Sequence, residues 1–136
     1  LDENTNEFIC ENIFPENSDG KIFCAYKTIK KEENENTITQ YLMVVAEEYY
    51  LKNNQLKIGT SVLVPVVVVS EKQENKYVVK EFKNPLKYNE GTGEIEELFP
   101  DYILKEIDSG NFNDDDTVNY LKTDVKNQAE KFFELN

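Results

Sequence analysis

The sequence predicts an α+β domain, with an antiparallel β-meander of about four strands and two C-terminal helices packed on one face of the sheet. Three observations support this prediction. Between residues 37 and 82, apolar and β-branched side chains recur in runs of strand length, separated by short polar turns. From about residue 94 onward, apolar residues recur at the spacing of helices. Strands followed by helices are typical of the α+β class, and 136 residues suit one domain.

The first 20 residues are predicted to be an acidic leader with one short element, followed by a single α+β domain over residues 21–136. Residues 1–20 contain six acidic residues and no lysine. Residues 7–14 are apolar enough for a short helix or an edge strand, and residues 15–20 have the composition of a turn. No signal peptide or membrane span is recognisable, and the polar start resembles a tether left after signal removal.

Four segments have the pattern of strands. They are residues 21–30, 37–51, 60–70 and 76–83. The second is apolar on both faces in its middle, which predicts a central strand covered on both sides, with a bulge near residues 46–48. The third contains Pro65, which has no N–H for a ladder and is therefore expected at an edge or a bulge.

The C-terminal part has the pattern of two helices. Residues 94–107 carry apolar side chains at helical spacing, and Pro100 is expected in the first turn of the main helix. Gly110 then interrupts the pattern. The last helix is predicted from the acidic cluster at residues 114–116 to about Leu135, with one apolar stripe along it.

The charge distribution excludes some classes of partner. The net charge is −12, and the parts 1–20, 21–88 and 89–136 contribute −6, +3 and −9. Acidic ends repel a nucleic-acid backbone or an anionic membrane surface, whereas a cationic partner is compatible with them. All 15 basic residues are lysines, so no guanidinium is available for bidentate recognition of anions.

The composition also argues against an enzyme. The chain has no histidine, so the commonest general base and the Ser-His and Cys-His nucleophile pairs are missing. Carboxylate catalysis is conceivable only at Glu47 and Glu48. Adjacent residues of a strand point to opposite faces, so these two cannot form an acid-base pair without a bulge. The alternative is structural: one glutamate faces solvent and the other pairs with a lysine. We expect no catalytic residue and no cofactor.

An aromatic surface on the sheet is the candidate binding site. Tyrosines on neighbouring predicted strands, with the adjacent glutamates, could present an exposed face to a peptide or a glycan. The residues are Tyr41, Glu47, Glu48, Tyr49, Tyr50 and Tyr77. Cross-strand packing in the core is the commoner role of such tyrosines.

Two further clusters carry weaker hypotheses. Asp114, Asp115 and Asp116 offer oxygen ligands for a weak calcium site, but their order does not fit an EF-hand, and capping of the last helix is the favoured interpretation. Cys10 and Cys24 are either a disulfide between the N-terminal segment and the first strand, worth about 3 kcal/mol, or two unrelated apolar side chains. Pairing cannot be derived from the sequence.

Several blocks of the sequence resemble a known group. They are KIFCAYK at 21–27, EEYYLK at 47–52, GTSVLVPVV at 59–67 and LFPD at 98–101. These blocks resemble uncharacterised small lipoprotein-like extracytoplasmic domains of clostridia and bacilli, which belong to the Firmicutes. The resemblance implies an exported protein tethered to the outer face of the membrane. It implies no activity, ligand or catalytic residue.

Two functions are therefore expected. The first is a non-enzymatic extracytoplasmic domain of lipoprotein type that binds a protein, a peptide or an envelope component, with a possible lipid tether upstream of Leu1. The alternative is a cytoplasmic acidic inhibitor or immunity-type protein that binds a basic toxin or nuclease. In both cases we expect a monomer, because Pro65 partly protects its strand from pairing with another chain.

Overall fold

A computed structural model of the chain describes residues 2–13, 20–85 and 98–134. Its elements are α1 (Asp2–Asn12), β1 (Lys21–Asn34), β2 (Thr37–Lys52), β3 (Gln55–Gln73), β4 (Lys76–Lys83), α3 (Asp101–Asp108) and α4 (Asp115–Phe132). The predicted turn at 15–20 lies outside the described residues except for Gly20, and so do residues 94–97 of the predicted helix.

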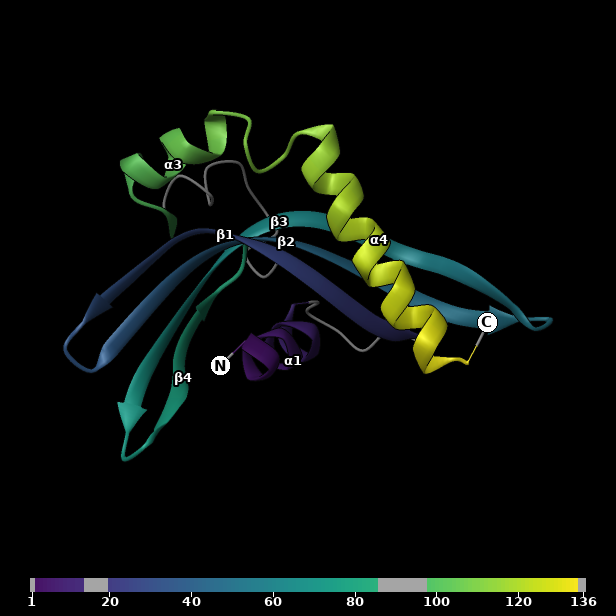
Figure 1. Cartoon of the computed structure of the whole chain (residues 1–136), viewed down its shortest axis with the longest axis horizontal. Coiled ribbons are helices and arrows are strands. Elements are labelled where there is room, and N and C mark those ends of the chain that lie inside the picture. Colours follow the sequence, from purple (N-terminus) through teal and green to yellow (C-terminus); the bar gives the residue numbers. More distant parts are fainter. Residues whose placement is uncertain (1, 14–19, 86–97, 135–136) are drawn as a thin grey trace.

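The four strands form one antiparallel sheet in the order β1-β2-β3-β4, which confirms the predicted meander (Figure 1). Both β1 and β3 are longer than predicted, because their polar ends continue the ladder into hairpins that project from the body of the domain. The hairpin turns use left-handed residues, with φ of 50° at Glu35, 55° at Asn53, 64° at Asn54 and 59° at Glu74. The asparagine pair suits the turn between β2 and β3, since two consecutive left-handed residues make the turn type that matches strand twist.

Helix α1 covers one face of the sheet and belongs to the core. Ile9 and Ile13 are fully buried against the even-numbered residues of β2 and their neighbours on β1 and β3. The ring of Phe8 meets that of Phe82 on β4 edge to face, with centroids 5.4 Å apart. The segment expected as an acidic leader therefore contains a helix that the sheet packs around, and the choice between helix and edge strand is settled as helix.

The two C-terminal helices cover the opposite face, as predicted. Figure 1 shows the sheet arched over α1, with α3 and α4 on the outer side of the arch. Helix α4 buries Leu121, Val125 and Ala129 against a cluster that includes Phe23 and Val45. Next to it, Phe99 and Ile103 at α3 pack on Tyr41 and Val67.

The ends of both helices differ slightly from the prediction. Pro100 is the N-cap residue of α3, with extended backbone, and the helix begins at Asp101. The ring of Pro100 fixes its φ near −63°, which a helix also has, but its ψ of 155° is not helical, so the first-turn placement was wrong by one position. Helix α4 ends at Phe132, and Glu134 has a left-handed φ of 57° that terminates it before the predicted end at Leu135, which lies outside the described residues.

Both expected irregularities of the sheet are present. The β2–β3 register shifts between Glu47 and Tyr49, opposite the extra residue of β3, which confirms the bulge. Pro65 pairs with Met43 of β2, and the described pairing of β3 with β4 begins only at Val67. The missing donor of Pro65 thus lies at a position of β3 that has no described β4 partner.

The burial of α1 predicts a large effect of truncating its core side chain. Ile9→Ala removes a fully buried side chain, and we expect it to lower the free energy of unfolding by about 2–5 kcal/mol. Ile58→Ala, at a side chain that is 52% exposed, is the matched control and should change it by less than about 0.5 kcal/mol. Urea denaturation measures both. Equal effects would show that α1 does not pack on the sheet.

Candidate functional site

The two glutamates of β2 are both buried and lie on opposite faces of the sheet. The Glu47 carboxylate accepts hydrogen bonds from the Tyr49 hydroxyl at 2.9 Å and the Ser61 hydroxyl at 2.7 Å. The Glu48 carboxylate accepts from the backbone N–H of Gly20 at 2.8 Å and of Thr60 at 3.3 Å. The bulge does not bring the two carboxylates together. The expected pairing of one glutamate with a lysine is wrong for the described residues, because neutral donors satisfy both side chains.

Two glycines make room for Glu48. A Cβ at Gly20 would lie 2.6 Å from the carbonyl oxygen of Tyr49, and a Cβ at Gly59 would overlap the Glu48 carboxylate. The carboxylate is held between them, where it joins the start of β1 to the bulge of β3 across β2. This arrangement is a structural clamp, in which each oxygen of the carboxylate accepts one backbone hydrogen bond.

The candidate aromatic surface does not form from the expected residues. Tyr41 and Tyr49 are buried, at 7% and 2% exposure, and pack against the C-terminal helices, so core packing is their role. Tyr50 and Tyr77 are both 39% exposed, but they lie on β2 and β4, the latter near the β3–β4 turn. The four tyrosines therefore do not share one exposed face, which corrects the sequence-based hypothesis.

The acidic cluster at 114–116 begins a helix. The Asp114 carboxylate accepts a hydrogen bond from the Thr117 N–H at 3.2 Å and is the N-cap of α4, while Asp115 and Asp116 occupy its first turn. Hydrogen bonds from Thr117 lower the pKa of Asp114. Among the described residues, no three acidic or cysteine side chains are grouped as metal ligands.

A groove lies along the outer edge of β1, and residues of α1, β1 and α4 line it. Its main chamber, of about 580 Å³, lies between α1 and α4. The lining residues are Asn6, Glu7, Cys24, Ala25, Tyr26, Asp124 and Gln128. A second chamber of about 350 Å³ shares Tyr26 and lies between β1 and the first turns of α4. Its lining residues are Tyr26, Lys27, Asp116, Thr117, Tyr120 and Leu121.

The floor of this edge groove is the backbone of β1. The Gln128 Nε2 donates to the carbonyl oxygen of Cys24 at 2.9 Å, so this carbonyl points away from β2 and into the groove. In an antiparallel ladder the N–H and C=O of one residue point to the same side, so the Cys24 N–H also faces outward. Within the described part of the chain, no strand pairs with this side of β1.

The walls of the edge groove are acidic. Glu7 on α1 and Asp124 and Asp116 on α4 face it from both sides. One cation lies along it, Lys27, whose ammonium is 5.0 Å from the Phe112 ring centroid and donates to the carbonyl of Asn111 at 3.0 Å. The carboxylates thus outnumber the cation in the groove, and that cation already has partners.

Sequence reasoning missed the residues of the edge groove. Glu7, Asp124 and Gln128 are ordinary polar residues of amphipathic helices, and nothing in their spacing marks them. The available signal was that β1 comes first in the meander. A first strand often lies at the edge of a sheet, where its outward backbone N–H and C=O groups need cover or a partner. The contact between Gln128 and Cys24 spans 104 positions and has no local signature.

The clamp predicts coupling between Glu48 and Gly59. Gly59→Ala should lower the free energy of unfolding by about 1–3 kcal/mol, because the new methyl group displaces a carboxylate that satisfies two N–H groups. In a Glu48→Ala background the same change should cost at least about 0.5 kcal/mol less. Chemical denaturation of the four proteins of this cycle measures the coupling. Additive effects would mean that Glu48 does not occupy this position.

The raised pKa values of two tyrosines predict that the fold loses stability at alkaline pH. Burial and the hydrogen bond to Glu47 raise the pKa of Tyr49 above its ordinary value of 10.0. The hydrogen bond to Glu32 raises the pKa of Tyr102 as well. A raised folded-state pKa stabilises the fold below about pH 10, and this contribution is lost as the pH rises further. Tyr49→Phe should flatten the fall in unfolding free energy between about pH 10 and 12, whereas Tyr120→Phe, at an exposed ring, should leave it unchanged.

No helix among the described residues is long and apolar enough to cross a membrane. The resemblance to small lipoprotein-like domains stays a prediction, since no comparison tests it. The chain matches no protein-family model, no curated protein and no solved structure.

Proposed function

We propose that the chain is a non-enzymatic binding domain that holds an extended, lysine- or arginine-containing segment of a partner protein as a fifth strand along β1. The observation that supports this most directly is the hydrogen bond from Gln128 to the Cys24 carbonyl, because it identifies outward-facing backbone at the floor of an open groove. A side-chain amide that caps such a carbonyl can be replaced by the N–H of an incoming strand.

The charge of the edge groove selects the partner. A strand on β1 would run between Glu7 and Asp124, with Asp116 farther along the same path. Side chains of the added strand alternate between the α1 side and the α4 side. Cationic side chains on either side would meet a carboxylate, and an acidic strand would be repelled.

The two glutamates that suggested catalysis have a structural role in the described part of the chain. Glu47 and Glu48 are the only pair that suggested catalysis, and each is held by two donors within the fold. Neither lies in the edge groove.

For its location we propose the extracytoplasmic side of the membrane, with a lipid tether upstream of Leu1. The support is the resemblance of the four sequence blocks to lipoprotein-like domains. The alternative is a cytoplasmic inhibitor of a basic toxin or nuclease, and the acidic first turn of α4 supports it. Such an inhibitor would use the folded surface of its partner and would not require a free segment.

Strand addition predicts a period of two in peptide binding. The probe is a fluorescein-labelled nonapeptide of alternating valine and lysine, measured by fluorescence anisotropy at low salt. Methylation of the backbone nitrogen at successive central positions removes one N–H at a time and keeps every side chain. It should weaken binding at least about tenfold wherever the lost N–H points to β1, and much less at the positions between. Equal effects at all positions, or no binding, would contradict strand addition. Uniform effects with steep salt dependence would favour the inhibitor alternative.

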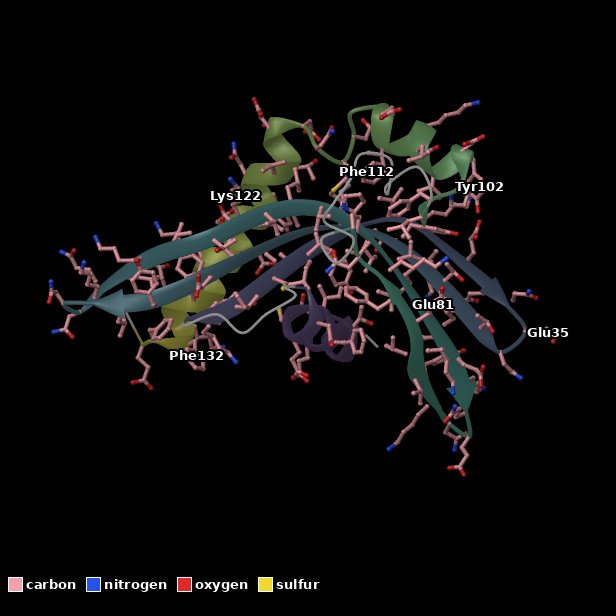
Figure 2. All side chains as sticks on the ribbon, turned by 180° about the vertical axis from the view of Figure 1, so that it is seen from behind. Glu35, Glu81, Tyr102, Phe112, Lys122 and Phe132 are labelled. Carbon is pink, nitrogen blue, oxygen red and sulfur yellow. The ribbon has the colours of Figure 1, made fainter. Side chains whose placement is uncertain are left out.

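A matched pair of double variants tests the acidic walls. Glu7→Gln with Asp124→Asn removes two charges and keeps the acceptor that Asp124 offers to Gln128, and we expect about tenfold weaker binding of the same peptide. The control variant, Glu71→Gln with Glu81→Gln, has the same net charge as the first variant, but its changes are at exposed residues of β3 and β4. Its affinity for the peptide should stay within about twofold of the wild type. Figure 2 shows Glu81 on β4, away from α4. Equal loss in both variants would show that only net charge matters.

The location has a separate test. Intact mass and N-terminal analysis of the protein from its native cell should reveal signal cleavage or a lipid-modified cysteine upstream of Leu1. An unprocessed initiator methionine would support the cytoplasmic alternative.

A further inference from the structure

The two cysteines of the chain meet at the contact between α1 and β1. Cys24 is fully buried in the core under α1, and Cys10 packs against the same cluster from the helix with its side chain partly accessible. The two free thiols therefore lie in one apolar cluster, between α1 and β1. They are the only cysteines of the chain, and 14 positions separate them along it.

We propose that Cys10 and Cys24 are a redox modification site, where a small disulfide-containing oxidant closes a bond that fastens α1 to the edge strand β1. This proposal goes beyond peptide binding and does not depend on it. Its basis is that the two thiols lie in one buried cluster, on two elements that pack against each other there. A disulfide there would join the helix to the strand that lines the edge groove.

The accessibility of the two thiols sets the order of the reaction. Cys10 is the thiol that an oxidant can reach, so its thiolate attacks the oxidant's disulfide and releases the first thiolate of the oxidant. The contact with Cys10 and burial raise the pKa of Cys24, which keeps this thiol protonated until the mixed disulfide forms beside it.

The second step closes the bond. Cys24 gives up its proton, attacks the Sγ of Cys10 and releases the second thiolate of the oxidant. In total the two cysteines lose two electrons and two protons, and the oxidant's disulfide is reduced to two thiols, which take up those electrons and protons.

The test treats the folded protein with oxidised glutathione and follows its intact mass. The wild type should lose two hydrogen atoms and retain no glutathione. Cys24→Ala should stop at a single glutathione on Cys10, and Cys10→Ala should not react until it is unfolded in denaturant. Circular dichroism of each variant verifies its fold, and the wild-type result stands without the variants.

Thermal unfolding gives a second readout. The oxidised wild type should melt about 10 °C above the reduced wild type, because the bond restricts the unfolded chain. Neither single-cysteine variant should show this shift with oxidant. A wild type that keeps two free thiols, or that accumulates glutathione on Cys10 without closing the bond, would overturn the proposal. So would a closed bond that lowers the melting temperature, since the thiols would then not be positioned for bonding.

Discussion

Strand β2 has almost no solvent-facing side, and the arrangement of the rest of the molecule follows from this constraint. Its residues from Gln40 to Tyr49 are all buried, on both faces of the sheet. A sheet whose central strand is apolar on both faces needs cover on both, and a meander of four strands supplies none. The N-terminal helix covers one face and the C-terminal helices cover the other. The three layers are therefore a consequence of the sequence of one strand.

The polar end of β2 carries two buried glutamates, Glu47 and Glu48. Beyond Ala46 these two consecutive glutamates interrupt the apolar run of the strand, before Tyr49 packs against α4. Buried carboxylates are costly unless hydrogen bonds satisfy them, and here each glutamate accepts two from its own face of the sheet. The pair that first suggests an active site thus holds the bulge and the start of β1 in register. The binding site that we propose lies elsewhere, at the edge of the sheet, where backbone groups and acidic side chains of α1 and α4 lie together.

Much of the architecture follows from local patterns. The four strands, their antiparallel order, the bulge near Glu48 and the edge character of Pro65 all arise from alternation, turn chemistry and the missing N–H of proline, which act within a few residues. The limits of β1 and β3 did not follow, because hairpin ends with polar side chains look like loops in the sequence. The role of α1 was also underestimated, since two buried isoleucines among polar residues give a weak pattern until the concave face of the sheet is known.

The residues of the proposed binding groove were the hardest to predict. We predicted a binding surface at Tyr41 and Tyr49 because aromatic residues on strands occur both in cores and at interfaces. Only the position of the helices shows that these two tyrosines belong to the core. The edge groove depends on α4 returning to β1 from the other end of the chain, and such a contact leaves no trace in local spacing. Backbone groups, which every sequence has, make its floor.

The contact between Gln128 and Cys24 also bears on the order in which the elements fold. The hairpins of the meander join residues that are close in sequence, so they can form early. The contact of α4 with β1 joins residues that are 104 positions apart, so we expect it to form later. A chain that emerges from its N-terminus completes the whole sheet before the last helix exists. During that interval Phe23, Val45 and the outer edge of β1 are uncovered, and an uncovered edge can pair with another chain. The last 20 or so residues therefore end a period of vulnerability to aggregation, and slow synthesis or export of this segment would extend it.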